Sequence, residues 1–136
     1  MAQETQGIIK VSPEYADGLR DLGGFERVWL LYWLDRAPAA QPRVVPFRDD
    51  VQRGLFATRS PCRPNPIGLS CVRLVGIQHN LLIIRGVDVL DGTPLLDIKP
   101  YVPEFDAFPQ SRAGWLQNGG NGRTLADDRF TSDESV

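Results

Sequence analysis

Short apolar runs separated by turn residues dominate the pattern of this 136-residue chain. Val28–Leu34 (VWLLYWL) is apolar at every position, which predicts a strand buried on both faces. Shorter runs predict further strands at Gly7–Val11, Arg43–Phe47, Leu55–Thr58, Leu69–Ile77, Leu81–Gly86 and Leu95–Lys99. So many short strands at close spacing predict a mainly β fold, a small antiparallel barrel or a sandwich rather than a βαβ fold.

One short helix is predicted at about residues 13–22. Ser12 can serve as its N-cap, Pro13 suits the first helical position, and Gly23-Gly24 ends it. The apolar side chains that would share one face of this helix are Tyr15, Leu19 and Leu22.

Two turn signals and a polar tail complete the pattern. Gln78-His79-Asn80 predicts a hairpin turn, and Asp91-Gly92-Thr93-Pro94 predicts a turn before the last strand. The chain becomes polar from about residue 118, so we expect one domain over 1–117 and a partly disordered tail over 118–136. Apolar side chains just before the tail should pack back onto the barrel: Phe105, Phe108, Trp115 and Leu116.

The loop within residues 53–70 (RGLFATRSPCRPNPIGLS) combines arginines with prolines. Pro64 and Pro66 restrict the backbone, which makes the loop stiff. One interpretation of Arg59 and Arg63 is that they only form ion pairs on the protein surface. A stiff loop that carries two guanidinium groups also forms a prepared site for an anion, because rigidity lowers the entropic cost of binding.

Composition narrows the function classes. The net charge is −2, so any nucleic acid would have to meet a local basic patch rather than a general basic coat. No signal peptide and no membrane-length apolar run is visible, which predicts a cytoplasmic protein without membrane contact. Cys62 and Cys71 lack CxxC spacing and His79 is the single histidine, so no metal site is expected.

Asp97, Lys99 and Tyr101 alternate along the last predicted strand, which places an acid, a base and a phenol on one face. Asp97 either faces solvent or faces a cleft. The aromatic residues of the long apolar run are interpreted as core or subunit interface, with a base-stacking platform as the less favoured alternative: Trp29, Tyr32 and Trp33.

Two long motifs resemble those of the TsaA-like (TrmO) family of β-barrel methyltransferases. Phe56–Ser70 match the family pattern FATRSxxRPNPIGxS, and Leu90–Tyr101 match LDGTPxxDIKPY. The resemblance covers about residues 7–116 and implies a homodimeric barrel that uses S-adenosyl-L-methionine and no metal. It further implies methylation of the N6 of a threonylcarbamoyl-adenosine beside the anticodon of tRNA.

The resemblance also implies roles for individual residues. Cofactor contacts carried over from the family are Asp35, Arg36, Arg59, Leu69, Arg85, Gly86, Val87 and Asp88. On chemical grounds, Asp97, or a water beside it, is the candidate acceptor for the proton that the adenine amine loses. The residues expected to hold tRNA phosphate or the threonyl carboxylate, or otherwise to contact the substrate, are Arg53, Arg63, Lys99 and Tyr101.

The start of the chain departs from the family pattern. Gly7–Pro13 is superficially similar to the usual opening, but its spacing to Phe25 and Trp29 fits the family's second strand. The first strand of the family and part of the cofactor pocket are therefore expected to be missing. The alternative function is a non-catalytic module, derived from this family, that binds S-adenosyl-L-methionine or RNA.

Overall fold

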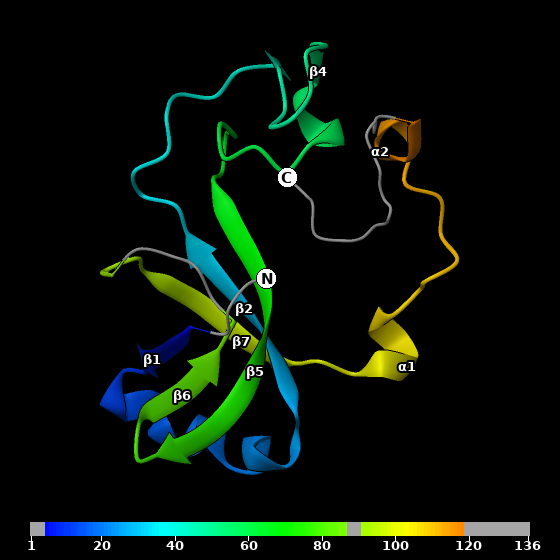
Figure 1. Cartoon of the computed structure of the whole chain (residues 1–136). Coiled ribbons are helices and arrows are strands. Elements are labelled where there is room, and N and C mark those ends of the chain that lie inside the picture. The colour runs from blue at the N-terminus through cyan, green and yellow to red at the C-terminus, as the bar shows by residue number, and fades with distance from the viewer. Residues whose placement is uncertain (1–4, 87–90, 119–136) are drawn as a thin grey trace. The chain divides into compact units, whose positions relative to one another are not determined.

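The computed structural model describes residues 5–86 and 91–118 (Figure 1). Two compact units make up the chain. Unit 1 consists of Met1–Arg36 with Pro66–Ala107, and unit 2 consists of Ala37–Asn65 with Phe108–Val136. Each unit is described by itself.

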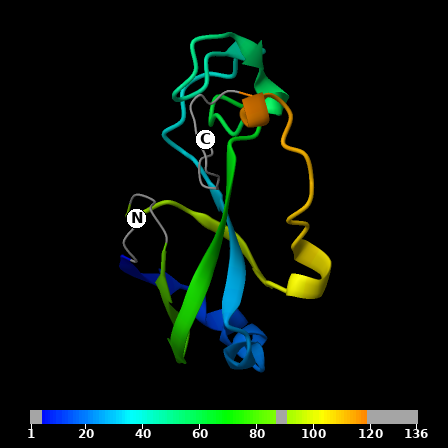
Figure 2. The same cartoon turned by 45° about the vertical axis from the view of Figure 1, so that its right-hand side comes forward.

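Unit 1 is built on a five-stranded antiparallel sheet. The strands are β1 (Gln6–Lys10), β2 (Arg27–Trp33), β5 (Ile67–Gln78), β6 (Leu81–Arg85) and β7 (Leu95–Pro100). Their spatial order is β1-β6-β5-β2-β7. β2 and β5 run side by side in both views (Figures 1 and 2).

The core lies against one face of this sheet because side chains alternate along each strand. On β2 the alternation buries Val28 and Leu30 completely, whereas Trp29 and Leu31 on the opposite face are half-buried. The other buried members of the core are Leu19, Val72, Leu82 and Ile84. Each such side chain contributes roughly 1.5–3 kcal/mol by leaving water. The run predicted to be buried on both faces is thus buried on one.

The mainly β class is confirmed, and so are the predicted strands that form the sheet of unit 1. Of the predicted strand Arg43–Phe47, only Arg43–Val44 is extended in a strand. The β5–β6 hairpin turns at the predicted position, where His79 adopts a left-handed backbone with φ of 56°. The sheet is open rather than closed into a barrel, since among the described residues β1 and β7 each pair on one side only.

The predicted helix forms two short 3-10 segments instead of one α-helix. They cover Pro13–Leu19 and Leu22–Gly24, and Asp21 between them has a left-handed backbone with φ of 69°. Because a 3-10 helix has about three residues per turn, the expected shared face is lost. Leu19 is buried, but Tyr15 remains 66% exposed.

Unit 2 contains a two-stranded sheet of β3 (Arg43–Val44) and β4 (Arg53–Gly54). The predicted strand at Leu55–Thr58 is wrong, because Leu55–Ala57 form a 3-10 turn. That turn is closed by the Thr58 N–H and hydroxyl, which both donate to the Leu55 carbonyl. Leu55 is 3% exposed and forms the buried centre of this turn.

Two short helices follow β7 along the chain, α1 (Pro103–Asp106) in unit 1 and α2 (Trp115–Asn118) in unit 2. The expected packing of the apolar residues here is mostly wrong, because Phe105 and Phe108 are 67% and 69% exposed. Trp115 is half-buried and donates its indole N–H to the Ala57 carbonyl at 2.8 Å. No helix in the described ranges has the length and apolarity needed to cross a membrane.

Gly68 allows the close approach of β2 and β5 at Tyr32. The two residues lie opposite each other, and a Cβ at position 68 would overlap the Tyr32 ring. The ring also holds its hydroxyl 2.7 Å from Ser70 Oγ. We predict that Gly68→Ala lowers the free energy of unfolding by about 1–3 kcal/mol, the usual cost of overpacking, measured by urea denaturation.

Gly76→Ala on the same strand is the matched control. Nothing lies within 4 Å of a Cβ at Gly76, so this substitution should leave the free energy of unfolding nearly unchanged. Equal losses for the two variants would contradict the role given to the Tyr32 contact.

A second prediction concerns the Asp49–Arg53 ion pair of unit 2. Asp49 Oδ2 accepts from Arg53 Nε at 3.0 Å, and this hydrogen bond, opposed by desolvation, lowers the pKa of Asp49 below its ordinary value. Because the folded pKa is the lower one, the stabilisation is present above about pH 3.9 and is lost as the pH falls through the folded pKa. Asp49→Asn should therefore lower Tm at neutral pH and converge with the parent protein in acid.

Arg53→Gln should show the same convergence in thermal unfolding, since it removes the other partner. A Tm difference for Asp49→Asn that persists unchanged in acid strong enough to protonate Asp49 in the folded protein would exclude the ion pair as its cause.

Candidate functional site

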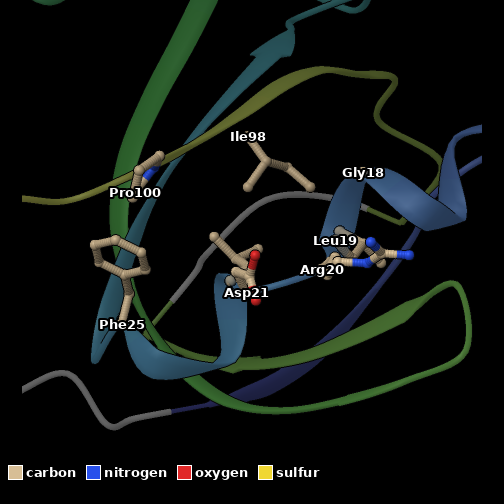
Figure 3. Close-up of a pocket in the computed structure, with 8 residues that line it drawn as sticks. Gly18, Leu19, Arg20, Asp21, Phe25, Ile98 and Pro100 are labelled. Atoms are coloured by element: carbon tan, nitrogen blue, oxygen red, sulfur yellow. The ribbon is translucent and has the colours of Figure 1, made fainter.

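Two depressions indent the described surface of unit 1. The smaller, of about 260 Å³, lies between the 3-10 segments and β7, where Phe25, Ile98 and Pro100 form its apolar wall (Figure 3). Its charged residues are Arg20 and Asp21, and Arg20 is paired with Asp17 at 3.1 Å. None of the residues predicted from the sequence to be functional lines it, so it is not the candidate site.

The larger depression, of about 340 Å³, lies on the face of the sheet opposite the core. We call it the outer groove. It is lined by Trp29, Leu31, Leu69, Lys99, Pro100, Val102, Phe105 and Asp106. Leu69 and Lys99 are among the residues that sequence reasoning assigned to cofactor and substrate.

Strand register brings the predicted residues together at this groove. Leu31 of β2 lies opposite Leu69 on one side and Asp97 on the other. Trp29, two residues earlier, lies opposite Lys99. A bulge at Leu96 shifts the β2–β7 register beyond this point, as bulges near sites commonly do to re-aim side chains. The prediction that Asp97 and Lys99 share a face is confirmed by this register.

Asp97 and Lys99 form an ion pair beside the apolar strip. Asp97 Oδ2 lies 3.4 Å from Lys99 Nζ, and Asp97 Oδ1 accepts the Ile98 N–H at 2.8 Å. Their side chains are 49% and 63% exposed, so the pair adds little to stability. Both groups remain accessible to a ligand.

One wall of the groove is Trp29, whose indole is held by its neighbours. Trp29 Nε1 donates to Asp106 Oδ2 at 3.1 Å, and the same oxygen accepts the Val102 N–H at 2.9 Å. The Tyr101 ring meets the Trp29 ring edge-on, with centroids 5.6 Å apart. α1 thus holds Trp29 in one orientation through Asp106. Sequence reasoning missed Phe105 and Asp106, because only the chain path after β7 brings them to Trp29.

Cys71 lies opposite Trp29 on β5 but is not a candidate nucleophile. Burial raises the pKa of its thiol, and the nearby Arg27 guanidinium only partly offsets this effect. At neutral pH the thiol is therefore protonated, and the thiolate is the reactive form of cysteine. In the described ranges, no group of three His, Cys, Asp or Glu residues comes together as a metal site would require.

Four described residues with predicted cofactor roles lie on other parts of unit 1. Asp35 and Arg36 follow β2 and are exposed, and Arg36 Nη2 reaches the Asp91 carbonyl at 3.4 Å. Arg85 ends β6, and Gly86 next to it has φ of 94°. Val87 and Asp88 lie outside the described residues.

The three predicted arginines of unit 2 differ in their surroundings. Arg63 Nη1 donates to the carbonyls of Thr58 and Ser60 at 2.9 and 3.0 Å, which closes the loop on itself. Arg53 is held by Asp49 and lies over the Trp115 ring at 4.8 Å. Arg59 is exposed and has no ion-pair partner in the described part of the chain.

The family model described as the tRNA-methyltransferase O N-terminal domain matches residues 1–107. A relative from Pyrococcus abyssi, named a probable S-adenosyl-L-methionine-binding protein, is 51% identical over 133 residues, which are 96% of this chain and 72% of the relative. The Escherichia coli protein named tRNA (adenine(37)-N6)-methyltransferase is 37% identical over 111 residues, covering 76% of this chain and 47% of that protein.

Solved structures agree with the family match. The crystal structure of TrmO from Pseudomonas aeruginosa superposes with a TM-score of 0.67 at 39% identity, over 81% of this chain and 48% of that chain. This chain spans about half the length of that structure and of the Escherichia coli protein. On the match over residues 1–107 and the identity to the Pyrococcus abyssi relative, this chain belongs to the family of the tRNA-methyltransferase O N-terminal domain.

Proposed function

We propose that this chain is a tRNA methyltransferase that transfers a methyl group from S-adenosyl-L-methionine to the N6 of an adenosine beside the anticodon. The observation that carries the proposal is the sheet face of the outer groove: Leu69 and Lys99 line the groove, and strand register sets Asp97 opposite Leu31 on the same face. The motif resemblance assigns Leu69 to the cofactor, and the chemistry of the side chains suits Asp97 to proton transfer and Lys99 to substrate contact. The names of the Pyrococcus abyssi and Escherichia coli relatives support both the cofactor and the reaction.

The chemistry of the available side chains fits S-adenosyl-L-methionine. Its carboxylate needs a cation, and Arg59 is exposed without a carboxylate partner in the described ranges. Its ammonium group and ribose hydroxyls need acceptors, and Asp35 is an exposed one. Gly86 has open space where a Cβ would stand, so a ligand can approach its backbone closely. When bound, the cofactor supplies a methyl group that is already activated.

The chain's own groups then position the acceptor and take up one proton. The fixed Trp29 ring and the apolar strip of Leu31 and Leu69 offer a flat surface for a base. Asp97 is the proposed acceptor for the proton that the amine loses. Lys99 Nζ lies 3.4 Å from Asp97 Oδ2 and remains exposed toward a substrate anion.

A homodimer is part of the proposal. Unit 1 also has exposed apolar side chains outside the lining of the outer groove, among them Ile67 and Leu96 at 44% and 51%, and exposed apolar surface can mark a subunit contact. A second copy of the chain would cover part of this surface. The alternative function is a non-catalytic module that binds cofactor or RNA without turnover. It would use the same surface, so only an activity measurement distinguishes it from the enzyme.

Cofactor binding tests the arginine assignment. Arg59→Ala should weaken S-adenosyl-L-methionine binding by roughly 10- to 150-fold in calorimetry, the value of a charge-assisted hydrogen bond. Arg43→Ala, another exposed arginine of unit 2, is the control and should bind normally. Equal affinities for the parent and Arg59→Ala would remove Arg59 from the cofactor site.

Methyl transfer tests the reaction. The protein should transfer labelled methyl from S-adenosyl-L-methionine to tRNA carrying the threonylcarbamoyl mark. Asp97→Asn should lower kcat by roughly 10²- to 10⁴-fold, the range for removing a general base, with unchanged cofactor affinity. Glu14→Gln, an exposed carboxylate outside the outer groove, should keep full activity. Cofactor binding without transfer to any tRNA would favour the non-catalytic module.

The dimer is tested by light scattering, which should give a mass close to twice the 15.1 kDa of one chain. Leu96→Glu places a charge on the exposed bulge of β7 and should shift the protein toward monomers, because burying an unpaired charge is costly. A monomer for the parent protein at all concentrations would overturn this part of the proposal.

A further inference from the structure

Unit 2 carries a local excess of positive charge on a chain whose net charge is −2. Its described residues include two acids, Asp49 and Asp50, and no lysine or glutamate. The arginines there are Arg43, Arg48, Arg53, Arg59, Arg63 and Arg112. Among the described residues, Arg53 is the one member of this set that is paired with a carboxylate. Arg43, Arg48, Arg59 and Arg112 are exposed and available to an anionic partner. Arg63 can offer the donors that its bonds to the Thr58 and Ser60 carbonyls leave free.

Two of these arginines each lie over an exposed phenylalanine ring. The Arg48 guanidinium is 5.4 Å from the centroid of Phe47, and the Arg63 guanidinium is 5.5 Å from that of Phe56. These distances are within the range of cation–π attraction. Both rings are 78% exposed, so most of each ring surface is open to a planar ligand.

The stack of Arg53 on Trp115 serves as an internal comparison. There the ring is half-buried, its N–H is bonded to Ala57, and the arginine is bonded to Asp49. That pair holds the unit together. Phe47 and Phe56 have no comparable packing, so a purely structural role leaves their exposure unexplained.

The backbone at Arg48 is a second, independent observation. The Asp49 N–H donates to the Pro46 carbonyl, which closes a four-residue turn with Phe47 and Arg48 at its centre. Arg48 has φ of 67°, and the residue with such a φ at this position of a turn is normally glycine. A non-glycine residue held there strains the backbone. At an exposed turn this strain points to a use for the arginine side chain itself.

We propose that Phe47 with Arg48 and Phe56 with Arg63 form a surface of unit 2 that binds single-stranded RNA. Unpaired bases stack on the two exposed rings, and the unpaired arginines contact the phosphates. Exposed aromatic rings among arginines are the combination that single-stranded nucleic acid uses, since every base offers a flat face and every nucleotide a charge. Paired bases in a duplex keep their faces covered. The inference rests on the proposed function for one choice: the single strand is taken to be RNA, and specifically the anticodon loop of tRNA.

The test is the binding of a labelled, unstructured RNA of about ten nucleotides, a length suited to such surfaces, followed by fluorescence anisotropy without cofactor. Phe47→Ala and Phe56→Ala should each weaken binding by roughly 5- to 150-fold. An RNA duplex of the same length should bind more weakly than the single strand to the parent protein. Tyr15→Ala is the matched control, because Tyr15 is a similarly exposed aromatic residue in unit 1, and it should leave affinity unchanged.

Arg48→Gly separates binding from folding. Glycine relieves the left-handed backbone, so Tm should stay equal or rise, while RNA affinity falls. The slope of log affinity against log salt should also decrease by about 0.7, the value for one phosphate contact on a single strand. Arg20→Ala removes an exposed arginine of unit 1 and should change neither quantity.

The outcomes distinguish this inference from the proposed function. The protein could bind single-stranded RNA through both phenylalanines and yet transfer no methyl group. That result would support the RNA-binding surface and exclude the proposed methyltransferase activity. Full methyl transfer with a KM for tRNA unaffected by the double variant Phe47→Ala, Phe56→Ala would overturn the surface and retain the enzyme. Dissociation of a dimer by that double variant, with RNA affinity intact, would assign the rings to subunit contact and also overturn the inference.

Discussion

The antiparallel pairing of β2 with β5 is the constraint on which the rest of unit 1 depends. It sets Val28 against Val72 in the core and Leu31 against Leu69 on the opposite face. A shift by one residue would exchange the two faces of β2, because side chains alternate along a strand. Core and outer groove are therefore specified together, and Gly68 permits the pairing by leaving room for the Tyr32 ring.

Unit 2 shows how one residue type takes separate roles according to its partners. Arg53 and Arg63 hold the unit's loops through Asp49 and through backbone carbonyls. Arg59 lies in the same motif without such partners in the described ranges, which makes its charge available to a ligand. Arg63 thus adds to the stiffness that Pro64 and Pro66 are expected to give the loop. Because Arg63 Nη1 is already bonded to two carbonyls, only the other donors of its guanidinium can contact a substrate.

Prediction from the sequence succeeded where a single run of residues carries the signal. β2, β7 and the β5–β6 hairpin follow continuous apolar or alternating stretches, so local pattern and tertiary burial agree. It failed where short segments respond to neighbours. Leu55–Ala57 turn instead of extending, and Pro13–Leu19 tighten into a 3-10 helix before the left-handed Asp21. In both segments the local sequence does not favour the observed 3-10 conformation over the predicted strand or α-helix.

The sequence by itself determined the family, the mainly β class and the alternation that places Asp97 and Lys99 on one face of β7. The motif residues Phe56–Ser70 and Leu90–Tyr101 are adjacent along the chain, so their chemistry is visible without a fold. Only the tertiary structure decided that Trp29 faces the outer groove, that α1 returns Asp106 to it, and that Phe47 and Phe56 stay exposed beneath arginines. Those arrangements depend on strand register and on contacts between residues distant in sequence, which no local pattern encodes.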